Sequence, residues 1–153
     1  MDHREIMNKV DHLLDEGRTA LLATTDGKGQ PHMRWMTPTV LKWRPNTLFA
    51  FTSPASQKVR HLQAHREVAW MVQDRALNEI IHLRGVMNVV DNPALRTELM
   101  EVLGSHLLVL WKANVDETEM VVLETVIKQA VYFVPMKGFR ELVSFPEPAA
   151  RPG

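Results

Sequence analysis

Apolar and polar residues alternate along much of this chain, and a period of two is typical of β-strands with one buried face. The longest example is 78–90, with Ile81 and Leu83 on one face and Arg84 on the other. Together with short apolar runs, the pattern predicts six strand segments: 19–25, 31–43, 47–52, 67–73, 78–90 and 120–134. Pro38 cannot donate to a strand ladder, so it predicts an edge position or a bulge in the second of them.

Helical spacing of apolar residues predicts three helices between these strands. Each is marked by capping or stop residues: a glycine after the first, a proline near the start of the second, and Asp91-Asn92-Pro93 at the start of the third. The expected bounds are Ile6 to a stop at Gly17, Pro54 to about Ala64, and Pro93 to an interruption at Gly104.

Short turns join most of the strands, as Asp26-Gly27-Lys28-Gly29 does between the first two. Six strands with few helices predict a mainly β fold, an antiparallel barrel with helices at its ends. We expect one domain over residues 1–145, because no linker or internal repeat interrupts it. The Pro-rich tail 146–153 is predicted to be disordered.

Composition narrows the functional classes. The 153 residues include 18 basic and 18 acidic side chains, so there is no overall charge to attract nucleic acid or an anionic membrane. The absence of cysteine excludes disulfides, thiolate catalysis and cysteine-bound metals. No apolar run reaches the roughly 18 residues of a membrane span, and the charged N-terminus does not resemble a secretory signal. These features predict a cytoplasmic protein.

Candidate chemistry is concentrated where the strand 47–52 meets the following helix. Thr52 and Ser53 end the strand, and Gln57 and Lys58 stand in the first helical turn. Hydroxyls, a lysine and the free amides of a helix N-terminus are the groups that bind phosphate. Arg34, in the preceding strand, would add a second cation if the two strands lie close. The sequence therefore predicts a phosphate site, although a solvated Lys58 is the simpler alternative.

Two histidines have the spacing of metal ligands but no third partner. His61 and His65 are four residues apart on one predicted helix, and neither a cysteine nor an H-E-x-x-H motif accompanies them. We interpret them as structural or solvated. No nucleophile–base arrangement is present either, so a bound cofactor would have to carry any chemistry.

The order of elements resembles the flavin-binding split barrels of the pyridoxamine 5'-phosphate oxidase-like group, which includes general stress proteins. The resemblance depends on an R-x-M-T strand at 34–37 followed by T-S-x-x-S-x-K at 52–58. It covers residues 6–90 well and 93–133 more loosely. It implies a six-stranded antiparallel split β-barrel that binds FMN at a homodimer interface.

The resemblance also implies a set of cofactor-binding residues. The second strand would line the flavin, the end of the third strand and the next helix would hold its phosphate, and an aromatic residue of the partner chain would pack near the ring. The positions concerned are Arg34, Trp35, Met36, Thr37, Phe51, Thr52, Ser53, Gln57 and Lys58, with Trp111 as the partner's aromatic residue.

The chain lacks the C-terminal Arg-x-His pair by which the namesake oxidase holds its substrate, so oxidation of vitamin B6 is not expected. The leading hypothesis is an FMN-dependent oxidoreductase acting on a small molecule. One alternative is a deazaflavin F420-dependent reductase on the same fold, with Arg60 and Lys42 near the acidic tail of F420. Another is a non-catalytic protein that stores or senses flavin, and the histidines leave haem binding open.

Overall fold

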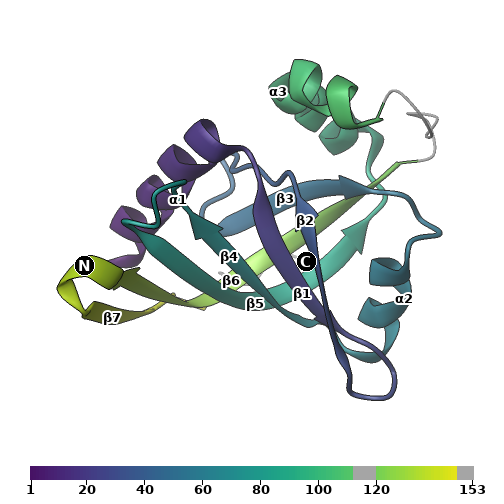
Figure 1. The fold of residues 1–153 in the computed structure, drawn as a ribbon. Helices are drawn as coiled ribbons and strands as arrows, with labels where there is room; N and C mark the ends of the chain where they lie inside the picture. The colour runs from purple at the N-terminus through teal and green to yellow at the C-terminus, as the bar shows by residue number, and fades with distance from the viewer. Residues whose placement is uncertain (112–119, 148–153) are drawn as a thin grey trace.

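The computed structural model describes residues 1–111 and 120–147, with only the backbone described over 104–111. Figure 1 shows a curved sheet with one helix near each end and a third beside it. The elements are α1 (His3–Gly17), β1 (Ala20–Thr25), β2 (Pro31–Met36), β3 (Thr47–Thr52), α2 (Gln57–Ala64), β4 (Glu67–Gln73), β5 (Ile80–Val90), α3 (Pro93–Trp111), β6 (Val121–Val134), η2 (Pro135–Lys137) and β7 (Phe139–Ser144).

The strands form one antiparallel sheet in the order β2-β1-β4-β5-β6-β3, with β7 added alongside β6. The mainly β, antiparallel split barrel expected from the sequence is confirmed. The structure adds β7 as a seventh strand, in a segment to which the sequence pattern assigned no element. Because β2 and β3 lie at opposite ends of the hydrogen-bonded path, the barrel is open between them. Within the described residues, an isolated bridge joins Thr39, which follows β2, to Phe49 of β3.

The long strand β6 changes partner half-way along its length. Its first half pairs with β3 and its second half with β7, while β5 follows it on the other side. Arg84 pairs with Gln129 and Gly85 with Ile127, so Lys128 is the extra residue of a bulge. A Cβ atom at Gly85 would lie 2.3 Å from the carbonyl oxygen of Val126. Only glycine therefore allows the two strands to approach so closely at this bend.

Two apolar clusters lie on either side of β3, and this explains why all six of its residues are buried. Leu48 and Ala50 face the barrel interior together with apolar residues of α1, such as Ile6. Phe49 and Phe51 face the other way and pack with residues of α3, including Leu99. A strand covered on both faces is continuously apolar rather than alternating, as the sequence 47–52 is.

Several predicted boundaries were wrong for local physical reasons. The second strand ends at Met36 rather than at residue 43, since Pro38 cannot continue the ladder. The second helix begins at Gln57 with Ser56 as its N-cap, so Pro54 precedes it. The third helix continues through Gly104, because one glycine weakens a helix without necessarily ending it. The predicted disordered tail lies mostly outside the described residues.

The first helix also ends differently from the prediction. Gly17 is its last helical residue, and Arg18 adopts the left-handed conformation, with φ 64° and its amide donating to the Leu14 carbonyl. Asp2 caps the other end by accepting from the Glu5 amide. None of the helices in the described part of the chain is both long and apolar enough to traverse a lipid bilayer.

The bend at Gly85 gives a direct test of the fold. Substituting Gly85→Ala should destabilise the protein by about 1–3 kcal/mol, since the added methyl group would overlap a backbone carbonyl that cannot move away easily. Gly27→Ala is the matched control, because a Cβ atom there would meet nothing within 4 Å. Urea denaturation of both variants measures the difference. Equal stabilities would contradict the close approach of β5 and β6.

Candidate functional site

The opening between the edge strands contains a cavity of about 220 Å³. We call it the split cavity, because it lies where no ladder joins β2 to β3. The end of β2, the end of β3 and the first turn of α2 surround it. Six residues that the sequence singled out line it, together with Thr19: Trp35, Met36, Thr37, Phe51, Thr52 and Lys58.

The other predicted residues lie outside this lining. Arg34 is half-buried on β2 and faces the inner side of the sheet, opposite Leu22 of β1. Ser53 accepts a hydrogen bond from the Ala55 amide at 3.3 Å and shapes the turn before α2. Gln57 is exposed at the first position of α2. The side chain of Trp111, at the end of α3, lies outside the described residues.

Two cations stand close together at this end of the barrel. Lys58 is half-buried, and its burial lowers the pKa of its amine, which the nearby positive charge of Arg34 lowers further. Burial also lowers the pKa of the Arg34 guanidinium. Among the described residues, no carboxylate forms an ion pair with either side chain. An anionic ligand would relieve the repulsion between them, so the arrangement is suited to bind a phosphate group.

Hydroxyl groups continue this polar region toward α2. The Thr52 hydroxyl donates to Ser56 Oγ at 3.1 Å. Ser56 is the N-cap of α2, yet its side chain makes no capping hydrogen bond to the helix. The amides of the first helical turn therefore lack a capping side chain beside Lys58.

Sequence reasoning missed a hydrogen-bonded chain that leads from Arg34 into the protein. Arg34 Nη1 donates to Thr24 Oγ1 at 2.8 Å, and Thr24 Oγ1 lies 2.8 Å from His61 Nδ1. The His61 ring contacts the ring of His32, with centroids 4.6 Å apart. His32 Nε2 in turn lies 2.9 Å from Asp26 Oδ2. The sequence signal for this chain was Thr24, a polar residue at a position of strand 19–25 where the alternation expects an apolar one.

His61 is thus the better-connected of the two histidines that have metal-ligand spacing. Its side chain is buried against β1, whereas His65 is exposed and follows α2. Burial lowers the pKa of His61, and the neighbouring His32 and Arg34 lower it further. No cluster of three potential metal ligands occurs in the described part of the chain.

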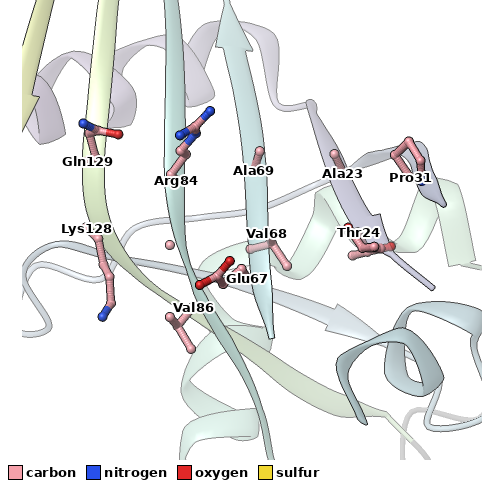
Figure 2. A pocket seen from close by; sticks show the side chains of 12 residues that line it. Ala23, Thr24, Pro31, Glu67, Val68, Ala69, Arg84, Val86, Lys128 and Gln129 are labelled. Atoms are coloured by element: carbon pink, nitrogen blue, oxygen red, sulfur yellow. The ribbon is translucent and has the colours of Figure 1, made fainter. Parts of the chain in front are cut away.

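A second hollow lies on the outer side of the sheet, across β1, β4, β5 and β6, with a volume of about 420 Å³. Figure 2 shows the small side chains of Ala23 and Ala69 within it, and Arg84 and Lys128 pointing toward opposite ends. Glu67 adds one acidic group. The hollow is larger than the split cavity, and its charged side chains, Arg84, Lys128 and Glu67, lie at its margins.

A comparison of the sequence with models of known protein families gives a match. Residues 6–132 match the family model described as pyridoxamine 5'-phosphate oxidase. The chain belongs to the pyridoxamine 5'-phosphate oxidase family. The family resemblance predicted from the strand and helix motifs is thereby confirmed. A comparison with curated proteins found no match.

Several solved structures share the fold of this chain at low sequence identity. They include a Clostridium acetobutylicum protein related to general stress protein 26, which is 13% identical with a TM-score of 0.72 over 94% of this chain and 96% of that chain. A FAD-binding protein from Mesorhizobium loti is 17% identical with a TM-score of 0.64 over 82% and 91%. A structure described as F420 reductase is 19% identical with a TM-score of 0.59 over 78% and 94%. At these identities, the likeness establishes the fold alone.

The hairpin end of the site should be sensitive to acid. Asp26 has a pKa lowered from 3.8 to about 2, first by the hydrogen bond from His32 and then by backbone amides. Its ionised form therefore stabilises the folded state above pH 4, and this stabilisation is lost as the pH falls toward 2. Asp26→Asn should lower stability at pH 7 and flatten its decline between pH 4 and pH 2, as measured by urea denaturation across that range. An unchanged decline would exclude the Asp26–His32 pair as its cause.

Proposed function

We propose that this protein is an FMN-binding oxidoreductase that acts on a small molecule, with the cofactor bound at a homodimer interface. The observation that carries the proposal is the pair of half-buried cations, Arg34 and Lys58, beside a cavity whose lining includes two aromatic side chains. Cationic side chains bind a phosphate group, and aromatic side chains stack on a planar ring. The FAD-binding and F420 reductase structures of the same fold support a cofactor of this class.

Each part of the cavity suits a different part of FMN. Lys58, Thr52 and the first amides of α2 would hold the phosphate, with Arg34 nearby. Trp35 and Met36 would lie along the ring system, and the Trp35 side chain is 59% exposed and accessible to it. The bound flavin would supply the transfer of hydride or electrons, and the protein residues would supply binding and orientation. Ser53 and Gln57 remain proposed contributors through the turn and helix start.

The split cavity of one chain is too small to enclose a whole flavin cofactor. Small-molecule sites usually enclose roughly 300–1,000 Å³, and the split cavity has about 220 Å³. A second copy of the chain would complete it. Trp111 of that copy is the aromatic residue that we propose to lie against the ring.

A row of mostly apolar side chains on the outer face of the sheet, interrupted by His82, supports the homodimer; we call it the apolar row. It crosses six strands through successive cross-strand pairs, and its end members, Trp35 and Leu142, are 59% and 61% exposed. A patch of this kind without cover is typical of an interface between protein chains. Its members in order are Trp35, Leu21, Met71, His82, Val131 and Leu142.

F420 is the second candidate cofactor, favoured by the F420 reductase neighbour. Its phosphate would occupy the same place as that of FMN, and its longer acidic tail would need further cations. Lys42 and Arg60 are both exposed and could supply them. Titrating the protein with each cofactor would distinguish the two, since Arg60→Ala should weaken F420 binding and leave FMN binding unchanged.

A non-catalytic flavin-binding protein is the third candidate. The first experiment is therefore an absorbance spectrum of the purified protein, before and after FMN is added and the excess removed, followed by stopped-flow reduction with NADH or NADPH. Retained flavin that is reduced rapidly supports an oxidoreductase. Retained flavin that is not reduced supports storage or sensing, and no retained flavin directs attention to F420.

Removing the lysine tests the phosphate site. Lys58→Ala should weaken FMN binding by about 1–3 kcal/mol, as expected for a lost charge-assisted hydrogen bond. Lys28→Ala, an exposed lysine in the β1–β2 turn, is the control and should bind as the unmodified protein does. Fluorescence titration measures both affinities. Equal FMN affinities for the two variants would show that Lys58 does not contact the phosphate.

The outer face can be tested separately. Met71 stands in the middle of the apolar row, so Met71→Lys should convert a dimer into a monomer by placing a charge in the interface. Leu77→Lys introduces the same charge at an exposed position in the turn between β4 and β5, outside the row, and should leave the assembly unchanged. Sedimentation velocity reports both masses. A dimer that survives Met71→Lys would place the interface elsewhere.

A further inference from the structure

A buried chain of hydrogen bonds runs from Arg34 through Thr24 to His61, and none of the proposed cofactor contacts uses it. We propose that Thr24 and His61 are positioning residues that hold Arg34 beside Lys58, so that both cations act on one anionic group. The inference deepens the proposed function and depends on it for the identity of that group, the phosphate of a flavin cofactor.

Arg34 has few other groups to hold it in place. Its Nη1 donates to Thr24 Oγ1 at 2.8 Å and more weakly to the Leu22 carbonyl at 3.4 Å. Both acceptors belong to β1, the neighbouring strand. No other residue in the described part of the chain accepts a hydrogen bond from its guanidinium. One edge of the group is therefore anchored, and the remaining N–H donors stay available to a ligand.

Without this anchor, repulsion would separate the two cations. Arg34 and Lys58 come from different elements, β2 and α2, and no acidic side chain lies between them as an ion-pair partner among the described residues. Arginine side chains otherwise have substantial rotamer freedom. Thr24, a residue only 1% exposed, holds the Arg34 guanidinium in one conformation through its hydroxyl.

His61 determines which way the Thr24 hydroxyl points. Its environment disfavours the charged ring: it is buried, and His32, Arg34 and Arg60 lie near it, while the carboxylate of Asp26 acts in the opposite direction. A neutral ring with a bare Nδ1 accepts the Thr24 hydrogen, which leaves the oxygen lone pairs free to accept from Arg34. His61 belongs to α2, as Lys58 does, so the same helix supplies one cation and orients the other.

His32 and Asp26, at the hairpin turn between β1 and β2, support this arrangement. His32 lies against the His61 ring and bonds to Asp26, whose other carboxylate oxygen accepts the amides of Lys28 and Gln30 at 2.9 Å. The turn between β1 and β2 is thus linked to α2.

The test separates phosphate recognition from general binding. Thr24→Val keeps the side-chain shape and removes the hydroxyl, so it should weaken FMN binding by about tenfold. Binding of riboflavin, which has no phosphate, should be unchanged. Thr24→Ser restores the hydroxyl and should restore FMN affinity, and His61→Leu should behave as Thr24→Val does. Flavin fluorescence measures all affinities.

A cofactor-free measurement accompanies it: the rise in melting temperature caused by inorganic phosphate. Thr24→Val and Arg34→Ala should both reduce this rise, and Thr24→Ser should retain it. Nitrogen NMR of the His61 ring should show an unprotonated Nδ1 at neutral pH in the unmodified protein.

Each outcome has a distinct meaning. If Thr24→Val binds FMN as the unmodified protein does, or loses FMN and riboflavin equally, the positioning role is wrong while the proposed function stands. If the unmodified protein binds no flavin but is stabilised by phosphate in a Thr24-dependent manner, the positioning role stands and the proposed function fails. If neither flavin nor phosphate binds, both are wrong.

Discussion

The close approach of β5 and β6 at Gly85 is the constraint on which the rest of the molecule depends. At that point β6 acquires an extra residue and changes from pairing with β3 to pairing with β7. A bulge increases local twist and bends a strand. The bend lets one sheet curl into a barrel while its two end strands, β2 and β3, form no ladder with each other. The opening that results is where the candidate site lies (Figure 1).

Electrostatics gives this opening its chemical character. A cation held partly out of water without a counter-ion is destabilised, and the protein places two of them, Arg34 and Lys58, near each other. Such an arrangement persists only when surrounding packing holds it, and it gains stability when an anion arrives. The helix α2 contributes on both counts, because it provides Lys58, its own first amides and the histidine that meets Thr24. The short helix α2 therefore both supplies groups for anion binding and helps hold the site in place.

Much of the fold could be predicted because it depends on local spacing. Alternation along 78–90 and the apolar run 47–52 identified two strands, and the hydroxyl-rich segment before Lys58 identified the start of a helix. The boundaries were less accurate where backbone details decided them. Pro38 ended β2 early, and α2 began at Gln57, after the N-cap Ser56, rather than at Pro54. The strand β7 was missed because its alternation is weak and because its partner is the second half of β6, a pairing that no local pattern indicates.

The sequence by itself determined the residue types of the site and the family to which the chain belongs, since both are properties of neighbouring positions. Only the tertiary structure decided which of those residues meet. Thr24 meets Arg34 diagonally across the β1–β2 hairpin, but it meets His61 across 37 positions, and that contact follows from no spacing rule. Curvature of the sheet brings the ends of β2 and β3 to one cavity, and helix packing adds Lys58. Contacts between distant segments arise from how strands bend and pack, which no short stretch of sequence encodes alone.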